Sequence, residues 1–507
     1  MMRSKLLLWV FPLLIAILVS LNLFWSKPLV PGFDTPFYLS EIRSFSYGFP
    51  NPLTYPYLDR YLTIAFPGTL SGVFGFDPVT SYRIAVTAIY VALAFVLFRL
   101  FKNLTQKDSA AAVLISALVI SPFLLTYSSM LFANLTGFLV MFSFLAIETG
   151  RDFKYKNILL GFIFGLIFYT HNFSTVSLGL IVATYYFLKL LMTKDVKIIK
   201  EGIIVFAIAT LIGFVGLSRY FGLDLSSLGR QTAAVISDGS ANVVVPTQPV
   251  VLGNETQRII ASLKEHSGKF WLYLFPVFAL VSLFLSRQEI FKNKKRFLLP
   301  LAIFLPSLIL TFQPLFHLNF LPERFVSLVV LSTYFFYVAI ITLPYFKRFL
   351  IPLAVLPLFL NYLASDGLIL NKGYRSFSGE EIQIYQMIKP LITKDGIVML
   401  SSNHEYWSRY FLNGIQVVTG DSFISCGTVT APGYFGEANF ILAKLLGEND
   451  PQRGTALVLR LKSLYPDKQL YILTDTNLGC GHGKILQNIT NVRQLLHQNN
   501  WYLYETI

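Results

Sequence analysis

The sequence predicts a polytopic α-helical membrane protein followed by a small extracytoplasmic α/β domain, and three observations lead to this fold class. The first is composition: of 507 residues, 54% are hydrophobic and 13% are charged, whereas soluble domains are about one quarter charged. The second is a series of apolar segments of about 17–25 residues, each long enough to cross a bilayer. The third is a change near residue 366, where helical and β-rich patterns begin to alternate.

The first apolar segment directly follows the basic start MMRSK. It reads LLLWVFPLLIAILVSLNLFW, which is longer than the apolar core of a signal peptide and lacks a small-residue cleavage site. We therefore expect a retained first span, near 6–25, with a cytoplasmic N-terminus.

The remaining spans and the topology follow from length, apolarity and the position of basic loops. Further spans are expected near 83–101, 109–127, 131–149, 157–171, 174–192, 202–220, 270–286, 297–315, 325–345 and 349–364. The segment 61–76 is short and interrupted by proline and glycine, and counting it as a span would place the basic loops outside. We therefore expect an interfacial or re-entrant helix there, about eleven spans, and a C-terminus on the outer face.

Two domains are expected, a membrane domain over 1–365 and an extracytoplasmic α/β domain over 366–507. The membrane domain carries two long outer loops, 26–82 and 221–268. The second domain holds 12 basic and 12 acidic residues, so the whole net charge of +14 lies in the membrane domain. There it follows short loops such as RDFKYKN, as the positive-inside rule requires, and no nucleic-acid partner is expected.

The α/β domain alternates predicted helices and strands, which indicates a mostly parallel sheet. Its predicted strands are GIVMLSS, GIQVVTG, QLYILTD and WYLYETI, and KILQNITNVRQLLHQ is expected to be the last helix. The chain's two cysteines, Cys426 and Cys480, both fall here. In an oxidising compartment they could form a disulfide, and two unpaired thiols are the alternative.

Charged residues gather in the first outer loop, in PGFDTPFYLSEIR. Pro36 suits the first turn of a helix, which places Asp34 just before the helix and Glu41 and Arg43 about two turns along it. A carboxylate held there could accept a proton from a hydroxyl or hold a divalent metal. The alternative is that Asp34 only caps the helix.

Other polar residues lie at predicted outer ends of spans. Glu323 and Arg324 begin the tenth span, and a basic residue there runs against the charge rule. Arg324 could bind a phosphate, or it could snorkel to lipid headgroups or pair with Glu323. His171 stands at the reversal between the fifth and sixth spans, where it could donate to a phosphate or a sugar hydroxyl or serve only the local structure.

The stretch from PGFDTPFYLSEIR to FGFDPVTSYRI resembles the first luminal loop of the GT-C superfamily of membrane glycosyltransferases. That superfamily includes protein mannosyltransferases, oligosaccharyltransferases and the aminoarabinose and arabinosyl transferases. The shared features are an acidic residue soon after the first span, an aromatic and proline-rich amphipathic stretch, and an outer C-terminal α/β domain. Some relatives carry two successive acidic residues, but Thr35 follows Asp34 here, so Glu41 is the alternative second carboxylate.

The resemblance implies a glycosyltransferase in a prokaryotic cell membrane that acts on the extracytoplasmic side. Its donor would be a polyprenyl-phosphate-linked sugar, and its acceptor would be a hydroxyl of a glycan, lipid or protein. Asp34 matches the family's catalytic position, and Arg324, Arg43 and His171 would surround the donor phosphate, with Glu41 and Glu323 beside the substrate. A divalent metal, Mg²⁺ or Mn²⁺, is compatible with these carboxylates, although no ligand spacing indicates one.

Two rival functions remain open at this stage. One is a transporter or lipid-linked-sugar flippase, for which matched broken helices and midplane charges would be expected. The other is a polysaccharide polymerase or ligase, which shares the donor type and relies on a large mid-chain outer loop.

Overall fold

The computed structural model describes most of the chain, in two compact units. It describes residues 2–26, 35–45, 60–125, 132–221, 292–312, 322–369, 379–401, 415–420, 436–475 and 483–507, with shorter pieces of 259–290 and 408–412. The first unit is helical and contains 2–26 and the described residues between 42 and 369. The second contains 35–41 and the described residues from 379 onward.

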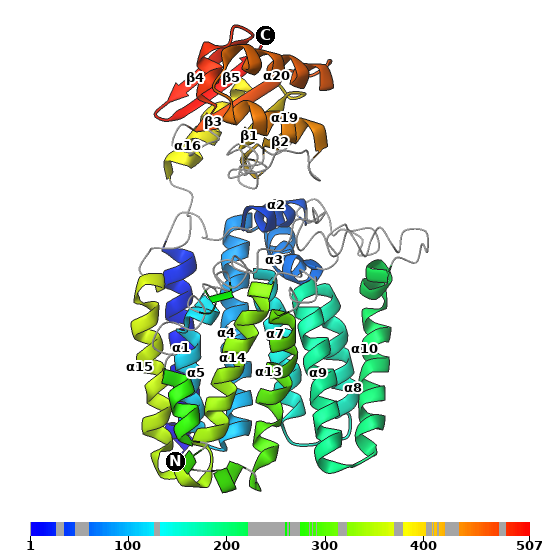
Figure 1. The fold of residues 1–507 in the computed structure, drawn as a ribbon, viewed down its shortest axis with the longest axis vertical. Coiled ribbons are helices and arrows are strands. Elements are labelled where there is room, and N and C mark those ends of the chain that lie inside the picture. Colours follow the sequence, from blue (N-terminus) through cyan, green and yellow to red (C-terminus); the bar gives the residue numbers. More distant parts are fainter. Residues whose placement is uncertain are drawn as a thin grey trace. The chain divides into compact units, whose positions relative to one another are not determined.

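The first unit consists of helices of very different lengths, and one of them, α2, is divided, with residues 35–41 counted in the second unit (Figure 1). They are α1 (Met2–Ser20) with a π-helical end (Leu21–Trp25), α2 (Thr35–Phe45), α3 (Tyr61–Phe74), α4 (Pro78–Thr105), α5 (Asp108–Val119), α7 (Phe132–Glu148), α8 (Lys156–Leu166) with the 3₁₀ turn η3 (Ile167–Tyr169), α9 (Asn172–Thr193), α10 (Lys197–Phe221), η4 (Lys294–Phe297), α13 (Leu298–Thr311), α14 (Pro322–Ile341), η6 (Pro344–Phe349) and α15 (Leu350–Ile369). Figure 1 shows the longer helices standing side by side as a bundle.

Length and composition single out a few of these helices as membrane spans. Within the described ranges, Pro78–Thr105 and Phe173–Thr193 are long and apolar enough to cross a membrane, and a third span results if Phe325–Ile341 and Pro344–Asn361, bent by 94°, count as one. Five shorter apolar helices accompany them, among them Tyr61–Phe74. A separate short helix is what the sequence predicts for this segment. The figure of eleven spans and the membrane sidedness stay predictions.

Four helices of the bundle run in the same direction. Their starts meet through ring pairs, Tyr82 with Phe132 at 4.9 Å between centroids and Phe173 with Phe325 at 5.2 Å. Helices α4, α7, α9 and α14 therefore begin at one end of the bundle. Helix α3 packs against α4, α7 and η3. We call this end, defined by α3 and the first turns of α4, α7, α9 and α14, the α3 end.

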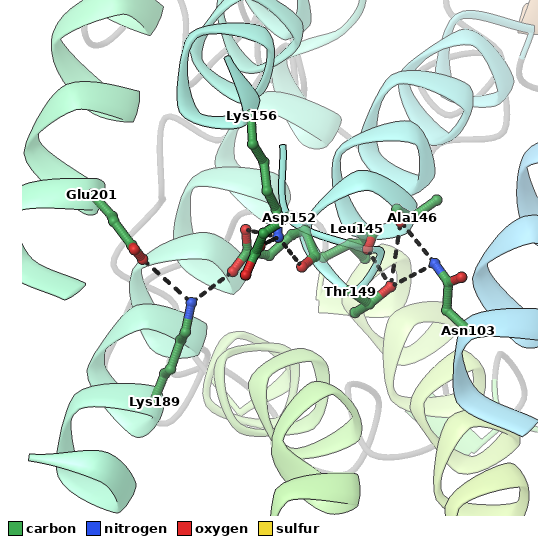
Figure 2. A network of polar contacts seen from close by, with 9 residues as sticks. Asn103, Leu145, Ala146, Thr149, Asp152, Lys156, Lys189 and Glu201 are labelled. Atoms are coloured by element: carbon green, nitrogen blue, oxygen red, sulfur yellow. Dashed lines mark hydrogen bonds and ion pairs between the residues drawn. The ribbon is translucent and has the colours of Figure 1, made fainter. Parts of the chain in front are cut away.

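The opposite end of the bundle is held by charged and polar side chains (Figure 2). Lys189 of α9 contacts Glu148 of α7 at 3.0 Å and Glu201 of α10 at 3.5 Å. Lys156 at the start of α8 contacts Glu148 at 3.8 Å and Asp152 at 2.8 Å. This network joins the ends of α7 and α9 to the starts of α8 and α10.

Basic turns gather at the same end as this network. Asn103, near the end of α4, donates to the Ala146 carbonyl at 2.9 Å, which brings the α4–α5 turn there. Arg296 of η4 donates to the carbonyl of Thr342, just beyond α14, and so brings the KKRF turn to the end of α14. The prediction that the basic loops share one side of the bundle agrees with this arrangement.

Glycines allow two helices of the bundle to approach closely. A Cβ on Gly161 of α8 would lie 2.6 Å from the Cβ of Ile208 in α10, and one on Gly165 would lie 2.6 Å from the Cβ of Ile212. Such contacts between small residues and branched side chains are a common packing mode of helices in membranes.

The second unit contains a five-stranded sheet in the order β2-β1-β3-β5-β4. Its elements are α16 (Gly379–Ile388), η7 (Lys389–Leu391), β1 (Ile397–Ser401), β2 (Gln416–Gly420), α19 (Gly436–Gly447), α20 (Pro451–Leu464), β3 (Leu470–Asp475), η10 (Lys484–Asn488), β4 (Val492–Gln498) and β5 (Trp501–Thr506). Strands β2, β1 and β3 are parallel, and β5 and β4 pair antiparallel beyond them.

Helices cover both faces of this sheet. The main core lies between the sheet and α19, α20 and η10, and includes Met399, Ile472, Leu445 and Val458. On the other face Trp501 of β5 contacts Tyr385 of α16, with the ring centroids 6.2 Å apart. The prediction of helices that alternate with strands therefore holds for this unit, but the sheet is not mostly parallel, because two of its four strand pairings are antiparallel.

The prediction of a helix over KILQNITNVRQLLHQ is wrong for its second half. Residues 492–498 form strand β4, which pairs with β5 through a tight turn at Asn499, whose φ of 54° is left-handed. The register shifts between Gln494 and Leu496. This irregularity breaks the period-2 alternation and makes the adjacent leucines appear helical in sequence.

Candidate active site

The last turn of α2 is fixed against α3 by an aromatic ring. A Cβ on Gly68 would lie only 2.6 Å from ring atoms of Phe45, so the ring occupies the space that a side chain would need. Phe45 also lies 6.2 Å from the ring of Tyr61. Arg43 is half-buried in the same turn of α2 and has interaction partners of its own. The glycine thus lets Phe45 anchor the turn that carries Arg43.

Helix α3 exposes an apolar surface. Phe66, Val73 and Phe74 are exposed, whereas Ile64 is buried. The helix ends at Gly75, whose φ of 70° suits glycine and whose N–H donates to the Ser71 carbonyl. An exposed apolar face on a 14-residue helix fits the predicted position at the membrane surface, which remains a prediction.

The start of α4 is built by Asp77. Its Oδ1 accepts from the backbone N–H groups of Val79 at 3.0 Å and Thr80 at 3.1 Å, and Pro78 occupies the first turn. Burial alone would raise the pKa of Asp77, but the hydrogen bonds from Thr80 and Val79 and the nearby charge of Arg83 lower it below the usual value. The motif FGFDPVTSYRI is therefore a capped helix start.

Arg83 is a cation that sequence reasoning did not single out. Its guanidinium carbon lies 5.6 Å from the centroid of the Trp25 ring, and the Trp25 Nε1–H donates to Thr87 Oγ1 at 3.2 Å. These contacts tie the end of the first helix to the first turns of α4. Arg83 begins the span predicted at 83–101, so it is a basic residue at a predicted outer span end. The argument that selects Arg324 could therefore have selected Arg83 as well.

His171 caps helix α9. Its Nδ1 accepts from the Phe173 N–H at 3.1 Å, and its carbonyl accepts from Thr175 N at 2.9 Å. An imidazole that accepts through Nδ1 carries its proton on Nε2 when neutral. His171 thus serves the local structure as a helix cap. Nε2 is the nitrogen with which the ring would donate to a ligand.

Three of the predicted site residues stand at two helix starts that touch each other. Phe173, two residues after His171, packs against Phe325, which directly follows Arg324. Glu323 and Arg324 lie in the first turn of α14. The side chains of Glu323 and Arg324 lie outside the description.

The other predicted residues are placed less completely. Asp34, Cys426 and Cys480 lie outside the described residues, so the base and the disulfide stay predictions. Glu41 is half-buried in α2 and has an interaction partner. Among the described residues no group of three or more His, Cys, Asp or Glu is placed to hold a metal ion, so the metal hypothesis gains no ligand set.

Comparison with known proteins finds likeness in fold only. No family model matches the sequence, and no curated protein matches it. The oligosaccharyltransferase of Archaeoglobus fulgidus, solved in complex with Zn and sulfate, is 15% identical with a TM-score of 0.56, over 92% of this chain and 68% of that one. The arabinofuranosyltransferase AftD from Mycobacteria is 12% identical with a TM-score of 0.54, over 98% of this chain and 40% of AftD.

A third structure is less similar. ArnT from Cupriavidus metallidurans, bound to undecaprenyl phosphate, is 12% identical with a TM-score of 0.45, over 99% of this chain and 98% of ArnT. That score is too low to establish a shared fold. The first two structures are glycosyltransferases of the GT-C type, and this chain has their fold.

Proposed function

We propose that this chain is an integral-membrane glycosyltransferase that moves a sugar from a polyprenyl-phosphate-linked donor to an acceptor hydroxyl on the extracytoplasmic face. The fold shared with the oligosaccharyltransferase and with AftD supports it. The observation within the chain that carries it is the contact of Phe173 with Phe325, which joins the helix capped by His171 to the helix that begins beside Arg324. Two helix starts that carry predicted polar site residues therefore lie side by side at the α3 end.

The proposed reaction is an inverting displacement. The acceptor oxygen attacks the anomeric carbon while the bond from that carbon to the phosphate oxygen breaks. The acceptor proton passes to the carboxylate of Asp34, and polyprenyl phosphate leaves with the bonding electrons. Arg324 and Arg43 would balance the charge on the leaving phosphate, and His171 would donate to it through Nε2. Glu41 would contact the sugar or act as a second carboxylate.

Arg83 extends this proposal by one cation. It is half-buried beside Trp25 and stands at the same end of the bundle as the starts of α9 and α14. A cation held by an aromatic ring at the membrane surface suits a lipid-linked phosphate, because both ligand and site lie where headgroups meet water. We expect Arg83→Gln to weaken donor binding more than it lowers the maximal rate.

The experiment uses the full-length protein in lipid nanodiscs with a radiolabelled, polyprenyl-phosphate-linked sugar and a panel of glycan, lipid and protein acceptors. Asp34→Asn is expected to lower the transfer rate by about a hundredfold or more, since a positioned base contributes about that much. Asp152→Asn removes an exposed carboxylate at the opposite end and serves as the matched control, with the wild-type rate expected. An Asp34→Asn protein that transfers at the wild-type rate would exclude Asp34 as the base.

The same assay separates glycosyl transfer from transport. A transporter or flippase would move the labelled lipid across the membrane without releasing polyprenyl phosphate. A metal requirement would appear as loss of transfer in EDTA that added Mg²⁺ or Mn²⁺ restores.

A further inference from the structure

Buried polar side chains without partners line the interior of the α3 end. Asn134, in the first turn of α7, is 1% exposed, and neither its Oδ1 nor its Nδ2 has a hydrogen-bond partner among the described residues. The hydroxyls of three other buried residues also have no hydrogen-bond partner within the described part of the chain. They are Ser174 and Ser177 of α9 and Thr63 of α3. We call these four residues the polar seam.

Packing places the members of the seam on helices that contact one another. A Cβ on Gly137, one turn after Asn134, would lie 2.0 Å from Ser174 Oγ, so α7 and α9 are in direct contact there. Because α7 and α9 run in the same direction, Asn134 lies on the side of Ser174 that faces the start of α9 and His171. Ser177 lies one turn further along the same face of α9. Thr63 belongs to α3, which packs against α7 and η3.

The energetic state of Asn134 differs from that of another buried asparagine, Asn361. A buried polar group without a hydrogen bond costs about 1–3 kcal/mol, and native proteins contain few of them. Asn361 of α15 is just as buried, but its Oδ1 accepts from the Tyr334 hydroxyl at 2.7 Å and its Nδ2 donates to the Ala117 carbonyl at 2.7 Å. Both ends of the Asn361 amide are therefore satisfied, whereas neither end of the Asn134 amide is satisfied among the described residues.

We infer that the polar seam binds the hydroxyl groups of the donor sugar, which rests on the proposed function. The seam offers amide and hydroxyl groups and no charge, which suits a neutral polyol and does not suit a phosphate. It lies beside the starts of α9 and α14, so a sugar in the seam would be next to a phosphate held by Arg324 and His171. Since the seam is buried, the sugar enters only when the helices at the α3 end move apart.

The test compares two buried asparagines replaced by leucine of similar size. Asn134→Leu is expected to raise the KM for the lipid-linked sugar about tenfold, the effect of losing about one well-made hydrogen bond. Its binding of sugar-free undecaprenyl phosphate should stay unchanged. Its thermal midpoint should be equal to or above that of the wild type, because an unsatisfied buried amide has been removed. Asn361→Leu should lower the thermal midpoint and leave the KM for the lipid-linked sugar and the KM for the acceptor unchanged.

Other outcomes overturn the inference. The inference is overturned if the donor KM is unchanged in both Asn134→Leu and the milder Ser174→Ala. It is also overturned if the thermal midpoint of Asn134→Leu falls as far as that of Asn361→Leu, because this result would indicate a site for ordered water only. A rise in the KM for the acceptor alone would place the acceptor there instead. If the wild type neither transfers nor binds any lipid-linked sugar, the proposed function fails first. A wild type that transfers, with variants that match it, refutes the sugar site alone.

Discussion

The ion-pair network at the end opposite α3 predicts a large stability loss for Glu148→Gln. The Glu148 side chain is 3% exposed and contacts Lys189 at 3.0 Å and Lys156 at 3.8 Å. Removing one partner of a buried pair costs about 3–5 kcal/mol, because the other charge stays buried. Here Lys156 keeps Asp152 and Lys189 keeps Glu201, and such exposed pairs recover about 0–1 kcal/mol each. We therefore expect a net loss of about 2 kcal/mol.

The assay is the thermal midpoint of the purified full-length protein in detergent, followed by intrinsic fluorescence. A loss of this size should lower the midpoint by roughly 3–6 °C for a unit of this size. Asp152→Asn is the matched control: Asp152 contacts the same Lys156 at 2.8 Å, but its side chain is 94% exposed. Its midpoint should change by less than about 1 °C. The reasoning is refuted if Glu148→Gln shifts the midpoint no further than Asp152→Asn does.

Two further predictions concern the α3 end. Gly68→Ala should displace Phe45 and with it the turn of α2 that carries Arg43, lowering the transfer rate about tenfold or more while the helical signal in circular dichroism stays unchanged; a fully active variant would contradict this positioning role. Asp77→Ala should destabilise the start of α4 by about 1 kcal/mol at neutral pH. Because the pKa of Asp77 is lowered in the folded protein, its contribution is complete above the ordinary carboxyl pKa and is lost as the pH falls through the lowered value. The wild-type and Asp77→Ala midpoints should therefore converge in acid, and a constant difference down to pH 3 would contradict the assignment.

The sequence predicts the elements of this fold better than the contacts between them. Apolar length and basic loops predict the helical bundle with one basic end, and the prolines and glycines of 61–76 predict a separate short helix. Short β-rich runs locate β1, β2, β3 and β5. Strand β4 is missed because its irregularity near Leu496 hides the alternation, and a strand in an antiparallel hairpin depends on its partner for recognition.

The sequence predicts which residue types the candidate site contains, but it does not predict which of them lie close together. A basic residue at an outer span end selects Arg324, and the same rule applied evenly would have selected Arg83. No pattern in the sequence predicts that Phe173 meets Phe325, because this contact depends on how helices distant in sequence pack. The polar seam cannot be predicted from the sequence either, because an asparagine in an apolar run does not reveal whether its amide finds partners, and the buried Asn134 and Asn361 differ in this respect.

The two ends of α7 and α9 differ in a way that bears on how a buried seam could open. At one end Glu148 and Lys189 form an ion pair, whereas at the other Gly137 packs against Ser174, whose hydroxyl has no hydrogen-bond partner among the described residues. Separation is therefore opposed by a strong contact at one end and mainly by packing at the α3 end, so that opening at the α3 end requires less free energy. If so, Glu148→Gln should lower stability without changing the donor KM, whereas Asn134→Leu should do the reverse. Equal effects of both variants on the donor KM would show that the ends of the helices are not independent in this way.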